Sequence, residues 1–172
     1  MSQLSQSLLG KNGSKHVVAS EAIETLERKI TIVLADDHAV VRQGIRSLLE
    51  QEPDFIVAGE AADGVQALEL IEHVQPDVLV IDMSMPNLGG IELLRIIKER
   101  GFPVRAVVFS MHGAQQYLSG ALEAGVYGYV LKEDGVEHLA RAIREAKLSH
   151  RYLSPKLSRH KPKVFDEFTK CP

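Results

Sequence analysis

The stretch PDVLVIDMSMP, residues 76–86, decides the fold that this sequence predicts. Four apolar side chains, Val78 to Ile81, lead directly into one carboxylate, Asp82, and Pro86 closes the segment. A short, continuous apolar run rich in Val and Ile is typical of a strand that is buried on both faces. A carboxylate at the tip of such a strand costs free energy unless other groups pair with it. The partners of Asp82 must therefore come from other parts of the chain.

Apolar runs of the same kind recur along the chain and alternate with helical patterns. Together with the run at 77–82, they predict strands at ITIVLA (30–35), FIVAGEA (55–61), VRAVVFS (104–110) and VYGYVL (126–131). Apolar side chains recur with the helical period over residues 41–51, 65–74, 91–101, 115–125 and 136–148. Five strand–helix repeats predict a doubly wound α/β domain, in which helices cover both faces of a five-stranded parallel sheet. We expect the pair Gly89-Gly90 to lie in a loop whose backbone conformation favours glycine.

The composition is that of an ordinary globular protein. The chain has 172 residues, 45% of them hydrophobic, which suits one domain with additions. No apolar run approaches the roughly 18 residues that a membrane span needs, and the first residues lack the pattern of a secretory signal. The only cysteine, Cys171, excludes an intrachain disulfide and a cysteine-rich metal site. We expect a cytoplasmic protein without a membrane partner.

Charge divides the chain into three parts. Residues 1–29 form a polar extension, with a short helix expected at EAIETLERK. Residues 30–148 carry 10 basic and 18 acidic side chains, whereas residues 149–172 carry 6 basic and 2 acidic ones. An acidic domain argues against binding nucleic acid through its own surface, because such binding needs clustered Lys and Arg. We expect the basic residues 149–172 to form a linker or a solvated tail.

The carboxyl ends of the expected strands carry polar side chains, which a parallel sheet brings to one edge. They are Asp36 and Asp37 after the first strand, Asp82 after the third, Ser110 at the end of the fourth, and Tyr129 and Lys132 at the fifth. Three ionised carboxylates repel one another unless a cation lies among them. Mg²⁺ binds one or two carboxylates together with phosphate oxygens, and a carboxylate can be the nucleophile in phosphoryl transfer. The sequence therefore predicts a Mg²⁺ site suited to an acyl phosphate.

This ordered set of residues resembles the receiver domains of bacterial two-component response regulators. The resemblance covers residues 30 to about 148. It rests on the pair Asp36-Asp37, the segment IDMSMPNLGGIELL, Ser110 at the end of the fourth strand, and Tyr129 three residues before Lys132. It implies the flavodoxin-like or CheY-like strand order 2-1-3-4-5.

The resemblance also implies the roles of the charged residues. Asp82 would be the phosphoacceptor, phosphorylated by a sensor histidine kinase. Asp37, Asp82 and the backbone carbonyl of Ser84 would hold Mg²⁺, and Asp36 would act partly through water. Lys132 would pair with the phosphoryl group. Ser84 and the nearby His112 border the expected path of hydrolytic water.

By the same resemblance, Ser110 and Tyr129 would form a switch pair. The hydroxyl would move toward the phosphoryl group, and the aromatic ring would turn inward behind it. The surface formed by the fourth helix (115–125), the fifth strand and the fifth helix (136–148) would change and control a downstream output, which we expect to be transcriptional.

Two further segments are similar to the regulators whose output is a LuxR-type helix-turn-helix domain. They are DDHAVVRQGIRSLLE (36–50) and RYLSPKLS (151–158). After them only RHKPKVFDEFTKCP remains, which is too short and polar for a DNA-binding domain. We therefore expect no direct DNA binding by this chain.

Other interpretations stay open at this point. The chain could act only by interaction, with a kinase, a second copy or a full-length regulator. A phosphatase of the haloacid-dehalogenase type also uses a strand-end aspartate with Mg²⁺, but it needs a second acid at the position that Ser84 occupies. Ser110 and Tyr129 also have an ordinary structural interpretation. His38 and His112 flank the site, and the carboxylates favour Mg²⁺ over zinc.

Overall fold

The computed structural model describes residues 29–159 and has a six-stranded parallel sheet at its centre. The sheet order is β2-β1-β3-β4-β5-β6. Its strands are β1 (Ile30–Ala35), β2 (Phe55–Ala61), β3 (Val78–Ile81), β4 (Arg105–Ser110), β5 (Gly128–Leu131) and β6 (Tyr152–Leu153). The predicted doubly wound sheet in the order 2-1-3-4-5 is confirmed, and β6 extends it at one edge. The helix expected at 21–29 falls on residues 1–28, outside the described residues, except for Lys29.

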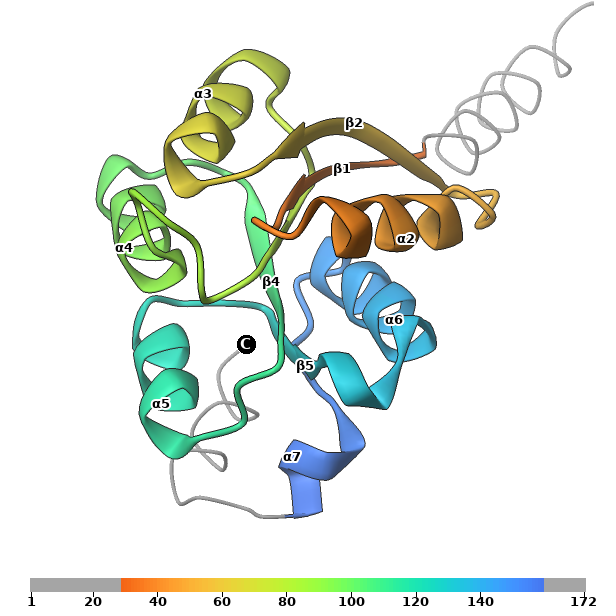
Figure 1. Ribbon diagram of the computed structural model, residues 1–172, viewed down its shortest axis with the longest axis vertical. Coiled ribbons are helices and arrows are strands. Elements are labelled where there is room, and N and C mark those ends of the chain that lie inside the picture. Colours follow the sequence, from red (N-terminus) through yellow and green to blue (C-terminus); the bar gives the residue numbers. More distant parts are fainter. Residues whose placement is uncertain (1–28, 160–172) are drawn as a thin grey trace, which may run out of the picture.

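Helices cover both faces of the sheet, as the strand–helix alternation predicts (Figure 1). They are α2 (Ala39–Leu49), α3 (Gly64–Val74), α4 (Gly90–Arg100), α5 (Gln115–Glu123), α6 (Val136–Lys147) and α7 (Pro155–Arg159), with a short 3₁₀ helix, η1, at Lys132–Asp134. One apolar cluster joins the sheet to α3, α4, α5 and α7, and a second joins it to α2 and α6. Between residues 29 and 159, no helix has the length and hydrophobicity needed to cross a bilayer.

The stretch 76–86 contains the central strand, β3, which pairs with β1 on one side and with β4 on the other. Its four residues are at most 3% exposed. Leu79 and Ile81 belong to one apolar cluster, and Val78 and Val80 to the other. Burying each of these side chains contributes about 1.5–3 kcal/mol. The backbone that ends in Asp82 is therefore held firmly from both faces and both edges.

The chain beyond residue 148 departs from the sequence-based expectation. A linker or a solvated tail was expected for residues 149–172, but β6 pairs in parallel with β5, and α7 follows it. Ser154 is fully buried, and its hydroxyl accepts a hydrogen bond from the Leu131 N–H. Leu157 joins an apolar cluster. Residues 152–159 are therefore not a solvated tail. A count of charges does not reveal that the edge of β5 needs a strand to pair with it. Residues 160–172 lie outside the described part of the chain.

The first turn of α4 packs closely against the end of β3. A Cβ atom on Gly90 would lie 2.7 Å from the backbone oxygen of Asp82 and 2.9 Å from the Cα of Met83. A Cβ atom on Gly89, in contrast, would meet nothing within 4 Å. The assignment of both glycines to loop geometry is therefore wrong for Gly90, which is the first residue of α4 and is needed for close packing.

We predict that Gly90→Ala destabilises the protein and Gly89→Ala does not. The methyl group at position 90 must displace backbone atoms, which costs about 1–3 kcal/mol in a well-packed region. At position 89 the backbone has φ −70° and ψ 160°, which alanine adopts without strain. Urea unfolding measures both variants, and equal losses in the free energy of unfolding would contradict this assignment.

Candidate functional site

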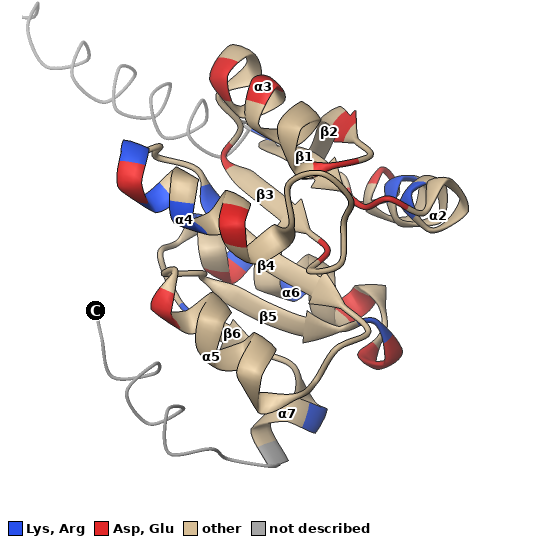
Figure 2. Ribbon diagram, turned by 60° about the vertical axis from the view of Figure 1, so that its left-hand side comes forward, with Lys and Arg blue, Asp and Glu red and all other residues tan. Residues whose placement is uncertain are grey.

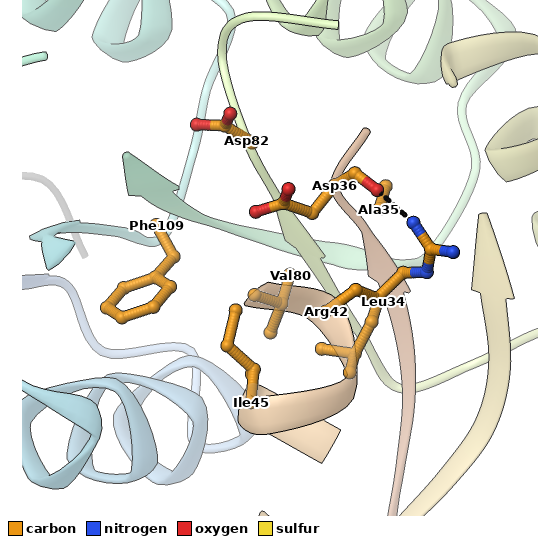
Figure 3. A pocket seen from close by; sticks show the side chains of 8 residues that line it. All are labelled: Leu34, Ala35, Asp36, Arg42, Ile45, Val80, Asp82 and Phe109. Carbon is orange, nitrogen blue, oxygen red and sulfur yellow. Dashed lines mark hydrogen bonds between the residues drawn. The ribbon is translucent and has the colours of Figure 1, made fainter. Parts of the chain in front are cut away.

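Two carboxylates and one ammonium group meet at the carboxyl edge of the sheet. Asp36 follows β1, Asp82 follows β3, and Lys132 follows β5. The Lys132 Nζ atom lies 2.6 Å from Asp36 Oδ2 and 3.5 Å from Asp82 Oδ2. All three side chains are at least 88% buried. Figure 3 shows the two carboxylates side by side at a small pocket with an apolar floor. The structure therefore brings together three strand ends that are far apart in the sequence.

The acidic pair after β1 contributes one buried and one exposed carboxylate. Asp36 is 3% exposed, whereas Asp37 lies at the rim, where its Oδ1 atom is 2.8 Å from Nδ1 of His38. Asp36, Asp37, His38 and Asp82 each offer one ligand atom, and these atoms lie within 4.8 Å of one another. The group is thus compact enough to surround one cation.

One oxygen of this group is left without a partner. Asp82 Oδ1 is buried and has no hydrogen bond to any described residue. A buried acceptor without a partner costs about 1–3 kcal/mol, and more when it is charged. A hard divalent cation bound by carboxylates would satisfy this oxygen, so the residues fit Mg²⁺. His38 also lies in the group, but three carboxylates and one exposed imidazole favour Mg²⁺ over zinc.

The loops that follow β3 and β4 are joined at the rim of the site. The hydroxyl of Ser84 is hydrogen-bonded to Nε2 of His112 at 2.8 Å. The imidazole of His112 stacks on the ring of Tyr117, with 4.7 Å between the ring centroids. His112 thus links the loop after Asp82 to α5. That the backbone carbonyl of Ser84 binds a metal ion stays a prediction.

Ser110 and Tyr129, the expected switch pair, both contact the same loop residue. Both side chains are fully buried. The Ser110 hydroxyl accepts a hydrogen bond from the His112 N–H at 3.3 Å, and the Tyr129 hydroxyl donates one to the His112 carbonyl at 2.6 Å. Burial, and then the negative charge of Asp82, raise the pKa of Tyr129, so its hydroxyl stays protonated and can donate. The ring of Tyr129 is already turned inward in this structure.

One residue near the site received no role from the sequence. Arg42, in the first half of α2, donates a hydrogen bond from Nη1 to the backbone oxygen of Asp36. It also lines the pocket that Asp36 and Asp82 border. The sequence holds one indication of this contact, which is that Arg42 lies six residues after Asp36. A helix that starts just after the end of a strand can place the side chains of its first turns near that end. The pattern alone does not say which polar side chain of the helix makes the contact.

Comparison with known proteins identifies relatives of this chain. The model of the response regulator receiver domain family matches residues 32–144. The chain is 36% identical over 132 residues to the transcriptional regulatory protein DegU of Brevibacillus brevis, covering 77% of this chain and 56% of that protein. It is 38% identical over 128 residues to the nitrate/nitrite response regulator protein NarL of Escherichia coli K12, covering 74% of this chain and 59% of that protein.

A solved structure of similar shape agrees with these relatives. The crystal structure of a LuxR-family two-component response regulator from Aurantimonas sp. SI85-9A1 has a TM-score of 0.74 and 35% sequence identity. The match covers 81% of this chain and 97% of that one. The chain spans less than two thirds of the length of DegU and NarL. The predicted resemblance is confirmed, and this chain belongs to the response regulator receiver domain family of two-component systems.

Proposed function

We propose that this protein accepts a phosphoryl group on Asp82 from a sensor histidine kinase, in the presence of Mg²⁺, and then changes its surface. The observation that carries the proposal is the buried, unpartnered oxygen of Asp82, held next to Lys132. An acceptor carboxylate must keep its oxygens available, one for the metal ion and one for phosphorus, while positive charge lies close by. The family relationship supports the same reaction, which takes place in the cytoplasm.

In this reaction, the Asp82 oxygen that does not hold the metal ion attacks phosphorus, while the bond to the donor imidazole nitrogen of the kinase breaks. Mg²⁺ neutralises part of the charge on the transferred group when it is bound. Asp37, Asp82 and the backbone carbonyl of Ser84 would hold the ion, and Asp36 would act partly through water. Lys132, whose Nζ atom lies 3.5 Å from Asp82 Oδ2, then pairs with an oxygen of the phosphoryl group on Asp82.

The new charge is transmitted through the loop after β4. The hydroxyl of Ser110, which accepts a long hydrogen bond from the His112 N–H, turns to donate its own proton to the phosphoryl group, because the charged phosphoryl oxygens are strong acceptors. The hydroxyl of Tyr129 is bonded to the carbonyl of the same residue, so its contact changes with the loop. The loop leads directly into α5, and the surface formed by α5, β5 and α6 therefore differs between the two states.

This surface has the character of a contact face. Figure 2 shows little charge on α5, where Glu123 is the one charged side chain. Partners that read the face would pass the signal to a transcriptional output, through a second copy or a full-length regulator. The described core is acidic, and we assign no direct DNA binding to it. The C-terminal segment β6–α7 lies against the same edge, because β6 pairs with β5 at Tyr129.

A phosphatase acting on small substrates is a weaker candidate. Its general acid would stand two residues after Asp82, where this chain has Ser84 with its hydroxyl bonded to His112. Steady multiple turnover of a small phosphomonoester, lost in Asp82→Asn, would favour that activity over the proposal.

We predict that Asp82→Asn abolishes phosphorylation. Incubation with acetyl phosphate and Mg²⁺ should add the mass of one phosphoryl group to the wild type and nothing to the variant, because an amide oxygen is a poor nucleophile. Glu92→Gln, which removes an exposed carboxylate from α4, is the control and should be labelled like the wild type. Equal labelling of Asp82→Asn would refute the assignment.

We also predict that Lys132→Ala is phosphorylated but does not switch. Without the ammonium group, the phosphoryl oxygens lose the partner that draws β5 and the β4–α5 loop toward the site. Amide chemical shifts around Tyr129 should then be the same before and after phosphorylation, whereas those of the wild type change. Arg95→Ala, which removes one positive charge from the exposed side of α4, is the control. The role of Lys132 in switching would be contradicted if phosphorylation changed the shifts of Lys132→Ala as it changes those of the wild type. It would also be contradicted if phosphorylation left the shifts of the wild type unaltered.

A further inference from the structure

Asp36 is held by contacts from four directions. Its N–H donates to the carbonyl of Ala61 at 3.1 Å. Its Oδ1 accepts from the His38 N–H at 2.8 Å, and its Oδ2 contacts Lys132 Nζ at 2.6 Å. Its backbone carbonyl accepts from Nη1 of Arg42 at 2.5 Å, the contact drawn in Figure 3. Among the described residues, Arg42 is the side chain that holds this carbonyl.

The carbonyl of Asp36 belongs to the peptide group that joins Asp36 to Asp37. A peptide group is planar, so a donor that fixes its oxygen also fixes the direction of the chain on both sides. The two side chains that leave from this peptide belong to the group of possible cation ligands. One hydrogen bond from Arg42 therefore bears on the orientation of both carboxylates.

Arg42 also forms an ion pair with the neighbouring strand, although its Nε atom has no hydrogen bond to any described residue. Its Nε lies 3.4 Å from Oε2 of Glu60, at the end of β2, and its side chain is 18% exposed. Arg46, one turn further along α2, contacts the other oxygen of Glu60 at 2.5 Å. A guanidinium group presents several donors in one plane and can bind a carbonyl and a carboxylate at once. Glu60 thus has two arginine partners, of which only Arg42 is bonded to Asp36.

The surroundings of Arg42 strengthen the contact. It lines the small pocket that Asp36 and Asp82 border, together with the apolar side chains of Leu34, Ile45, Val80 and Phe109 (Figure 3). Charges interact more strongly beside an apolar surface than in water. The hydrogen bond from Arg42 to the carbonyl of Asp36 is therefore partly shielded from water.

We propose that Arg42 is a positioning residue of the Mg²⁺ site, which orients Asp36 and Asp37 by holding the peptide between them. The inference rests on the proposed function, because it concerns the same site. Arg42 contacts neither the ion nor the phosphoryl group. Its effect is on the affinity for Mg²⁺, and the chemistry at Asp82 is unchanged once the ion is bound.

The test is a calorimetric titration of the whole chain with Mg²⁺ alone. Arg42→Gln should bind Mg²⁺ about tenfold more weakly than the wild type, the size typical of losing a group that orients a metal ligand. At saturating Mg²⁺, its rate of labelling by acetyl phosphate should return close to the wild-type rate. Arg42→Lys keeps the charge and one donor, so its affinity should lie between the two.

Arg46→Gln is the matched control. It removes the other arginine that pairs with Glu60, on the same helix, but makes no contact with Asp36, so its Mg²⁺ affinity should stay within about twofold of the wild type. Equal Mg²⁺ affinities of Arg42→Gln and Arg46→Gln would overturn the inference. Arg42 would then serve only to pack α2 against β2. If Arg42→Gln does not fold, Arg42→Lys decides: wild-type affinity overturns the inference, and a several-fold loss supports it.

The two proposals fail in distinguishable ways. If the wild type binds Mg²⁺ and is labelled on Asp82, but Arg42→Gln binds like Arg46→Gln, only the inference about Arg42 fails. If the wild type binds Mg²⁺ but accepts no phosphoryl group, the proposed function fails, and the affinities of the variants still decide the role of Arg42. A wild type that binds no Mg²⁺ overturns both.

Discussion

Two carboxylates held at the end of a buried sheet are the constraint on which the rest of this structure depends. Asp36 and Asp82 are 3% and 5% exposed, where water solvates a charge poorly. Lys132 pairs with both, but one ammonium cannot neutralise two buried acids and their exposed neighbour, Asp37. The arrangement therefore costs stability, which the apolar strands around it offset. The same excess of negative charge favours binding of a divalent cation. The bound cation would then offset the negative charge of an incoming phosphoryl group.

The rigidity of the acceptor and the mobility needed for switching lie in different parts of the molecule. Asp82 ends a strand that is buried on both faces, and Gly90 lets α4 pack against its backbone. The groups expected to move, Ser110 and Tyr129, are instead joined to the loop after β4 through hydrogen bonds to His112. Hydrogen bonds that exchange for stronger ones can move a loop without disturbing a packed core.

The convergence of Asp36, Asp82 and Lys132 could be predicted from the sequence, because parallel strands place their carboxyl ends at one edge and the apolar runs mark where each strand ends. Other features could not be predicted from these patterns. The role of His112 depends on where a loop folds back, and the packing role of Gly90 depends on how closely a helix approaches a strand. The edge strand β6 was missed because pairing with β5 depends on a neighbour distant in the sequence, and a count of charges pointed to a solvated tail.

The sequence by itself determined the class of fold, the family and the identity of the residues at the strand ends, since each follows from local hydrophobic periodicity and from short motifs. Only the tertiary structure decided which of these residues touch. It paired Lys132 with Asp36 more closely than with Asp82, left one oxygen of Asp82 without a described partner, and brought Arg42 to the peptide after Asp36. These contacts depend on distances of a few ångströms between separate elements. Such distances are set by packing in three dimensions, which a pattern along one chain does not contain.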